Sequence, residues 1–333
     1  MKDSVDEVDI QIILKSYFEN YFDETEIWKV IPKHNLPFRE FGFERIDKGF
    51  TRNKSFKEIS HLKEYLFTFP VSGAYIGSVY KDRLLQGNRE NKPITIHNSE
   101  WMGRELLFDL DMDDYQNVRT CDCQGRNVCE ICWTLMQDAA EIITDTLEVD
   151  FGFKELIWVY TGGRGYHCWV LDANAFTMDQ EQRAALIGYM QLIQDPKGNE
   201  RIDSLGNSSK LLKERIYKKL ARNFILNEKN TILQNECGYS KNMLDKARIT
   251  LDKSNLIQDL MRSIPKDESQ FLNALIKRRY PRIDHKVSID TRRLIRMPES
   301  VHIKTKNICK IIKDPVSFNP LNDAINLNTI FSM

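Results

Sequence analysis

Four cysteines within twelve positions place the strongest constraint on what this chain can fold into. They have the spacing Cys-x-Cys-x5-Cys-x2-Cys and are Cys121, Cys123, Cys129 and Cys132. Four thiolates at this spacing can surround one tetrahedral Zn²⁺ ion, with Zn–S bonds of about 2.3 Å. A site closed by four protein ligands is structural, because it leaves no open position for water. We therefore expect a zinc knuckle at 119–135 that serves folding or docking, although the spacing is also compatible with an iron–sulfur cluster.

The rest of the composition is typical of a globular protein in a reducing compartment. The seven cysteines are odd in number and four of them are clustered, which argues against a disulfide framework. Hydrophobic residues make up 41% of the chain and charged residues 29%, as in ordinary globular proteins. No apolar run approaches the length of a membrane span, and the acidic segment Met1 to Val8 differs from a secretory signal. We therefore expect an intracellular protein that does not interact with a membrane.

Residues 105–112 predict a β-strand that carries two carboxylates. Apolar side chains alternate along this segment, so that one face is formed by Leu106, Phe108, Leu110 and Met112 and the other by Glu105, Leu107, Asp109 and Asp111. Asp109 and Asp111 would then lie about 7 Å apart along one face, which is close enough to share cations. Two Mg²⁺ or Mn²⁺ ions about 4 Å apart can activate a hydroxyl in phosphoryl transfer. A solvated strand end is the ordinary alternative for Asp-x-Asp, but the wholly apolar opposite face favours the metal site.

A glycine-rich segment that also holds an arginine and a histidine follows later in the chain. Its sequence is Thr161-Gly162-Gly163-Arg164-Gly165-Tyr166-His167. The apolar segments 156–160 and 167–171 predict two strands, so the glycines would form the turn of a hairpin. Three glycines allow backbone N–H groups to approach a ligand closely, and Arg164 and His167 add donors suited to a triphosphate. Glycines alone would indicate only a turn, whereas the two side chains favour a phosphate site.

A third carboxylate, Asp284, ends the segment Tyr280-Pro281-Arg282-Ile283-Asp284. Basic residues follow it, namely Arg293, Arg296, His302 and Lys304. Taken alone, these residues would indicate a solvated basic face. Together with the two earlier motifs, they become candidates for the same site.

The order of the predicted elements indicates an α/β (α+β) fold whose core is interrupted by helices. The expected elements are helices near 10–22 and 131–150, strands within 38–80 and at 301–304, and a helical, lysine-rich pattern from 177 to 279. We therefore divide the chain into a first part of the core at 1–176, a helical subdomain at 177–279 and a second part of the core at 280–333.

These motifs together resemble the catalytic (small) subunit of the archaeo-eukaryotic DNA primases. The resemblance runs from about Tyr17 to Phe318. Its most specific blocks are Arg39-Glu40-Phe41, Arg52 with Ser55-Phe56, Ile76 to Tyr80, Glu105 to Asp114, Cys121 to Met136, Asp150 to Phe153, the glycine loop through Val170, and Tyr280 to Asp284. The resemblance implies a prim-fold catalytic core of mixed sheets and helices, an inserted helical subdomain and a zinc knuckle.

The resemblance also implies a role for each candidate residue. Asp109, Asp111 and Asp284 would hold catalytic Mg²⁺ or Mn²⁺, and Glu40 corresponds to an acidic residue of the active site. The residues around the triphosphate of the incoming nucleotide would be Arg52, Thr161, Gly162, Gly163, Arg164, Gly165, His167, Arg293, Arg296 and His302. The implied reaction is the synthesis of short RNA primers on single-stranded DNA.

Two departures from the family pattern affect these expectations. Eukaryotic relatives often have adjacent cysteines at the head of the zinc block, whereas this chain has Cys121-Asp122-Cys123. They often have a second arginine in the glycine loop, where this chain has Gly163. Arg164 is then the only guanidinium of the loop, so we expect triphosphate binding to depend more on Arg52 and Arg296.

The leading hypothesis is a primase subunit that joins ribonucleotides by two-metal attack of a 3′-hydroxyl on an α-phosphate. One alternative is a repair-type primase-polymerase that extends ends with deoxynucleotides. Another is a zinc-containing nucleic-acid-binding subunit without catalysis. This non-catalytic hypothesis is disfavoured because all the candidate catalytic residues are present, namely Asp109, Asp111, Asp284, Arg164 and His167.

Charge and resemblance together predict the partners. The formal net charge is zero, so this chain alone should bind its template weakly. The resemblance implies a large primase subunit, usually bearing an iron–sulfur cluster, and a DNA polymerase of the primosome. Eukaryote-like motifs further imply a nuclear location.

Overall fold

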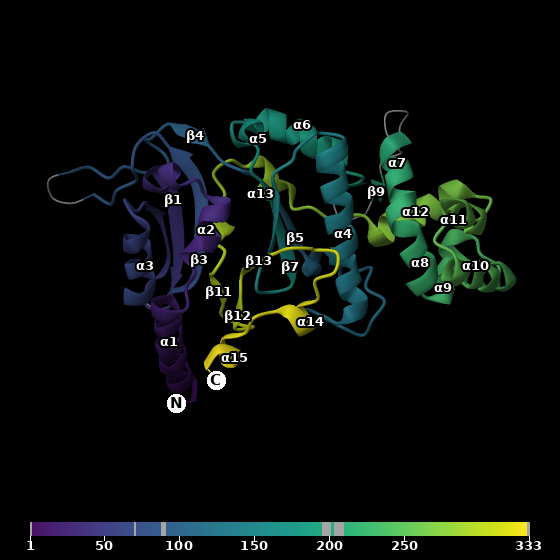
Figure 1. Ribbon diagram of the computed structural model, residues 1–333, viewed down its shortest axis with the longest axis horizontal. Helices are drawn as coiled ribbons and strands as arrows, with labels where there is room; N and C mark the ends of the chain where they lie inside the picture. Colours follow the sequence, from purple (N-terminus) through teal and green to yellow (C-terminus); the bar gives the residue numbers. More distant parts are fainter. Residues whose placement is uncertain (1, 70, 88–90, 195–200, 203–209, 332–333) are drawn as a thin grey trace.

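The computed structural model describes residues 2–69, 71–87, 91–194, 201–202 and 210–331 of the 333-residue chain. Two antiparallel sheets form its centre, and helices cover them (Figure 1). The α+β class predicted from the sequence is confirmed. Within the described ranges, no helix is both long and apolar enough to cross a lipid bilayer.

The first sheet has the strand order β10-β3-β1-β2, with β4 paired to β3. Its strands are β1 (Arg39–Arg45), β2 (Gly49–Lys54), β3 (Val71–Tyr80), β4 (Trp101–Gly103) and β10 (Ile295–Arg296). The helices of this part are α1 (Lys2–Asn20), α2 (Glu24–Val30) and α3 (Ile59–Thr68), with a 3₁₀ turn η1 at Lys33–Phe38. The prediction of strands throughout 38–80 is wrong at α3, where Leu62 and Leu66 face the core at helical spacing.

The second sheet has the strand order β13-β6-β7-β5. Its strands are β5 (Leu106–Asp111), β6 (Leu156–Tyr160), β7 (Gly165–Val170) and β13 (Lys310–Ile312). The predicted strand at 105–112 and the predicted hairpin around the glycine turn are both confirmed. The register of β5 and β7 pairs Asp109 with His167 and Asp111 with Gly165, which places the glycine turn beside the carboxylates.

The apolar face of β5 packs as the alternation predicts, but the opposite face is not simply solvated. Leu106, Phe108 and Leu110 enter the core under helix α4 (Glu130–Val149), which confirms the predicted helix at 131–150. Leu107, on the other face, is buried in the core of the first sheet. Strand β5 therefore lies between two cores, and only its last residues, Asp109 and Asp111, are partly exposed.

A buried ion pair ties the two sheets together. The guanidinium of Arg39 on β1 donates two hydrogen bonds of 2.7 Å to the carboxylate of Glu105, which precedes β5. Both side chains are almost fully buried. Arg39 also donates to the carbonyl oxygen of Gly77 at 2.9 Å. The bidentate pair fixes the position of β5 relative to the first sheet.

Helices follow the second sheet, as the sequence predicts. They are α5 (Ala173–Phe176), α6 (Gln180–Met190), α7 (Lys210–Ile216), α8 (Arg222–Asn227), α9 (Asn230–Cys237), α10 (Lys241–Lys253), α11 (Ile257–Ser263) and α12 (Glu268–Arg279), with a π-helical segment at Tyr217–Ala221 and a short hairpin of β8 (Ile193–Gln194) and β9 (Arg201–Ile202). Helix α6 contributes to the same core as α4 and β5, whereas α7 to α12 surround a third core, to which Ile142 of α4 also belongs. The division of the chain at 177 and 279 stays a prediction.

After α12 the chain returns to both sheets. The elements are α13 (His285–Ile289), β10, β11 (Val301–His302), β12 (Asn307–Ile308), β13, α14 (Pro320–Asp323) and α15 (Leu327–Phe331). The strand predicted at 301–304 ends at His302, because the next residues turn and the N–H of Lys306 donates to the carbonyl oxygen of His302 at 2.8 Å. Thus β10 joins the first sheet and β13 the second, and the intervening segment lies beside the glycine turn.

Candidate active site

A cleft of about 490 Å³ lies where the two sheets meet. Its walls come from six separate stretches of the chain: the end of β1, the start of β3, the end of β5, the cysteine loop, the glycine turn with β7, and the segment from Asp284 to Thr305. Segments far apart in the sequence thus contribute to one site. Most of the residues predicted from the motifs line this cleft.

Three carboxylates meet at one end of the cleft. Asp109 and Asp111 end strand β5, and Asp284 is the N-cap residue of α13, where its side chain accepts the N–H of Lys286 at 2.9 Å. The backbone N–H of Asp284 donates to the carbonyl oxygen of Asp109 at 3.1 Å. Burial, followed by the charges of Asp111 and Asp284, raises the pKa of Asp109 to about 7. Such mutual repulsion is what a divalent cation would relieve.

The glycine turn is held rigidly beside the carboxylates. Gly165 pairs with Asp111, and a side chain at this position would meet the carbonyl oxygen of Leu110 at 1.9 Å. Gly162 has a left-handed φ of +76° and packs against His302. The hydroxyl of Thr161 accepts the N–H of Gly163 at 3.3 Å. Glycine is therefore required here by close approach and by backbone conformation.

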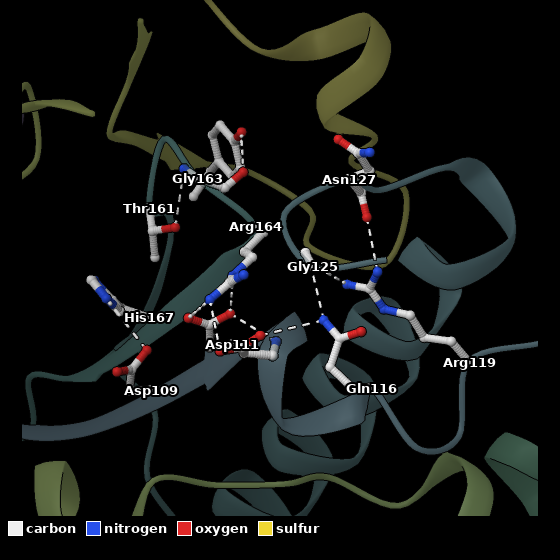
Figure 2. Close-up of polar contacts among 12 residues, drawn as sticks. Asp109, Asp111, Gln116, Arg119, Gly125, Asn127, Thr161, Gly163, Arg164 and His167 are labelled. Carbon is white, nitrogen blue, oxygen red and sulfur yellow. Dashed lines mark hydrogen bonds and ion pairs between the residues drawn. The ribbon is translucent and has the colours of Figure 1, made fainter. Parts of the chain in front are cut away.

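Arg164 extends from the turn to the carboxylates (Figure 2). Its Nε donates to Asp111 at 2.6 Å, and its Nη2 lies 3.1 Å from a carboxylate oxygen of Asp113. Asp111 is thus neutralised by an arginine in this structure. A cation that binds Asp111 would displace this guanidinium and leave it available to another anion.

His167 on β7 faces Asp109, with 3.6 Å between Nε2 and Oδ1 (Figure 2). Burial, followed by the charges of Arg296 and Arg104, lowers the pKa of His167 to about 3. The imidazole is therefore neutral at physiological pH and can donate one hydrogen bond and accept another.

Basic residues from the C-terminal part of the chain also line the cleft, in a segment that lies beside the glycine turn. They are Arg293, Arg296, His302 and Lys304. Arg296 lies over the ring of Tyr75 and donates to its hydroxyl at 3.2 Å. Partial burial, followed by the charges of Arg296 and Arg126, lowers the pKa of His302 to about 4. This wall offers cations and neutral donors to an anionic ligand.

Three of the predicted residues, namely Gly162, Glu40 and Arg52, are not among those that line the cleft. Glu40 on β1 is completely buried, and its carboxylate accepts hydrogen bonds from Arg52 at 2.8 and 3.0 Å and from the N–H of Asn53 at 3.2 Å. Arg52 also donates to the carbonyl oxygen of Arg292 at 3.0 Å. The pair therefore supports the backbone next to Arg293 from behind. Arg52 is not among the residues that line the cleft, and its part in triphosphate binding stays a prediction.

Several cleft residues were not foreseen. Glu44, Ser72 and Tyr75 line it from the first sheet, and Arg126 lines it from the cysteine loop. Glu44 shares the alternation of Glu40 along β1, which was the one signal that could have pointed to it. Nothing in the local sequence distinguishes Arg126 from any exposed loop residue.

The four clustered cysteines come together as the spacing predicts. The sulfur atoms of Cys121, Cys123, Cys129 and Cys132 all lie within 4.8 Å of one another. The N–H of Cys129 donates to the sulfur of Cys132 at 3.2 Å, at the start of α4. Four thiols at this separation fit a tetrahedral metal ion.

Comparison with known proteins agrees with this geometry. The sequence model of the family described as DNA primase small subunit matches residues 108–314, which is more than half of the chain. The chain belongs to the DNA primase small subunit family. The matched residues include the three aspartates, the four cysteines, the glycine turn and the basic wall, but neither Glu40 nor Arg52.

Individual primase small subunits are similar over most of their length. The DNA primase small subunit of Saccharomyces cerevisiae is 27% identical over 90% of this chain and 79% of its own length. The DNA primase small subunit PriS of Methanobrevibacter smithii is 29% identical over 87% of this chain and 88% of its own length. The DNA primase small subunit of Caenorhabditis elegans is 27% identical over 89% of this chain and 80% of its own length. The relatives thus include both eukaryotic and archaeal primases.

Proposed function

We propose that this chain is the catalytic subunit of a DNA primase and synthesises short RNA primers on single-stranded DNA. The convergence of Asp109, Asp111 and Asp284 in one cleft with an arginine-bearing glycine turn carries the proposal. A carboxylate end suits divalent cations, and a basic wall suits phosphates. Family membership supports the assignment as a nucleotidyltransferase.

The three carboxylates would hold Mg²⁺ or Mn²⁺. When bound, two such ions supply charge stabilisation for both the attacking 3′-hydroxyl and the leaving pyrophosphate. Arg164, once released from Asp111 and Asp113, could donate hydrogen bonds to the triphosphate. The neutral imidazole of His167 lies close enough to the carboxylate end to donate a hydrogen bond to a phosphate oxygen.

The first sheet and the C-terminal segment would complete the nucleotide site. Arg293, Arg296 and His302 line the same cleft as the glycine turn, and His302 packs against that turn, so a triphosphate in the cleft would have donors from both segments within reach. Glu40 and Arg52 would act at a distance, since their ion pair supports the backbone of Arg292.

We further propose that the four cysteines bind structural Zn²⁺. The thiol cluster precedes α4, whose apolar face packs under β5, so an ion there would anchor this helix end.

Membership of the primase small subunit family supports the presence of protein partners. We propose a heterodimer with a primase large subunit, association with the DNA polymerase of a primosome, and a nuclear location if the source is eukaryotic. The net charge of zero fits a subunit that needs a partner to hold its template.

The test is primer synthesis on a single-stranded template without a primer, with Mg²⁺ or Mn²⁺. We expect the wild-type chain to join ribonucleotides, and Asp109→Ala or Asp111→Ala to lose roughly a thousandfold or more in rate while remaining folded. Retained activity in either variant would refute the proposal. Preference for deoxynucleotides and for pre-existing ends would instead indicate a repair-type primase-polymerase.

A further inference from the structure

Arg126 is a cationic residue of the cleft that none of the sequence motifs explains. It belongs to the loop between Cys123 and Cys129, yet it lines the cleft together with Arg164 and Lys304. Its side chain is exposed, and within the described residues its guanidinium has no hydrogen bond or ion pair. An unpaired cation that faces the proposed nucleotide cleft is available to an anionic ligand.

The backbone on both sides of Arg126 is fixed. The carbonyl oxygen of Gly125 accepts hydrogen bonds from Gln116 at 3.0 Å and from Arg119 at 3.4 Å, and that of Asn127 accepts from Arg119 at 2.9 Å (Figure 2). The N–H of Asn127 closes a turn onto the carbonyl oxygen of Gln124. The loop thus presents Arg126 from a held position, which reduces the entropy lost when the side chain binds a ligand.

The same contacts connect this loop to the glycine turn. Gln116, which holds Gly125, also donates to Asp113 at 3.3 Å, and Asp113 pairs with Arg164. Figure 2 shows Arg164 between the aspartates on one side and Gly125 on the other. Arg126, which follows Gly125, therefore belongs to a loop that Gln116 and Asp113 connect to Arg164, and both arginines line the cleft.

The glycine turn supplies only one guanidinium, because Gly163 has no side chain. The field of Arg126 also reaches His302, which packs against the glycine turn, and helps to lower the pKa of this histidine. A nucleotide with its reacting phosphate at the carboxylates would extend its remaining phosphates past Arg164 toward this region.

We infer that Arg126 binds the terminal phosphate of the incoming nucleoside triphosphate and supplies a second guanidinium to the site. This inference rests on the proposed function, since it takes the nucleotide to lie in the cleft with its reacting phosphate at the aspartates. It assigns the cysteine loop a part in substrate binding in addition to any role as a metal site.

The experiment compares Arg126→Ala, Arg126→Lys and wild type in binding ATP and ADP with Mn²⁺, and in binding a labelled oligothymidylate. The control is Arg262→Ala, which removes an equally positive, exposed side chain from α11, away from the cleft. We expect Arg126→Ala to weaken ATP binding roughly tenfold and ADP binding less than about twofold. Arg126→Lys should recover part of the loss, and DNA binding should not change.

An equal loss for ATP and ADP, a loss of DNA binding alone, or no change would each overturn the inference. Equal zinc content and melting temperature in all variants would establish that the loop is intact. Failure of the proposed function has a different signature, because wild-type protein would then neither bind ATP in the cleft nor make primers.

Discussion

The N–H of Asp284 donates a hydrogen bond to the carbonyl oxygen of Asp109, so the third carboxylate is attached to strand β5 through the main chain. The contact does not depend on the protonation of either side chain. It joins a loop after the helical region to a strand that precedes it by more than half the chain's length. The carboxylate end of the cleft is thus brought together by the fold before any cation binds.

Tyr115 positions this loop and provides the first prediction. Its hydroxyl accepts the N–H of Arg282 at 2.9 Å, two residues before Asp284. Tyr115→Phe should cost about 1 kcal/mol of stability and weaken Mn²⁺ binding several-fold, because Asp284 would be less firmly placed. The control is Tyr239→Phe, which loses a partly buried hydrogen bond to the carbonyl oxygen of Ser263 in the helical region. Equal effects of the two changes on Mn²⁺ affinity would contradict the positioning role.

The raised pKa of Asp109 predicts a pH dependence that metal reverses. Folding favours the protonated carboxyl, so this group stabilises the metal-free protein at low pH, and its contribution is lost as pH rises toward about 7. Cation binding requires the ionised form and should therefore be stronger at about pH 8 than at about pH 6. Melting temperatures measured with and without Mn²⁺ at about pH 6 and about pH 8 would show how cation binding changes with pH. Asp109→Asn should stabilise the metal-free protein at the higher pH and abolish the gain from Mn²⁺; an unchanged gain would be inconsistent with the assignment.

Gly165 should tolerate no side chain. Its neighbour, the carbonyl oxygen of Leu110, is backbone and cannot move without breaking the pairing of β5 with β7. Gly165→Ala should therefore cost about 3 kcal/mol or more and reduce ATP binding. Gly188→Ala in α6 has open space around it and should stabilise the protein by up to about 1 kcal/mol. Thermal unfolding of the two variants would measure the difference in stability. A small loss of stability in Gly165→Ala would mean that β5 and β7 move apart to accommodate the methyl group.

Cys132 is the most buried member of the cysteine cluster, which makes it the best position at which to test the metal. Cys132→Ser should lower the zinc content of the purified chain and reduce the melting temperature by roughly 5 °C or more. Cys237→Ser is the matched change at a buried cysteine of the helical region, and it should retain full zinc. Zinc would be measured by plasma mass spectrometry. Full zinc in the first variant would indicate that three thiols suffice or that the ion lies elsewhere.

Local patterns predicted the elements that carry the chemistry. The alternation around Asp109 and Asp111 identified β5, and the glycines around Arg164 identified the turn, because both signals lie within a few neighbouring residues. Helix α3 was missed, since Glu58 at its N-cap makes no side-chain capping hydrogen bond and strands surround it. Sequence patterns predict short helices least well when the residues at their ends carry no clear capping signal.

The roles of Glu40, Arg52 and Arg126 could not be predicted in the same way. Glu40 and Arg52 form an ion pair outside the cleft. This ion pair depends on the pairing of β1 with β2, and Arg52 also contacts the backbone of Arg292. Arg126 reaches the cleft only because Gln116 and Arg119 hold its loop there. Such contacts are set by tertiary packing, and no periodicity in the sequence reports them.

The separation of Asp109 from Asp284 in the chain has a consequence for biosynthesis. During translation the first two aspartates, the cysteine cluster and the glycine turn leave the ribosome together, whereas Asp284 and the basic wall follow only after the whole helical region. A nascent chain that has emerged as far as α12 would hold an incomplete cation site and one wall of the cleft. A product that ends before residue 284 would accordingly keep the four cysteines and the glycine turn but lack the third carboxylate and the basic wall.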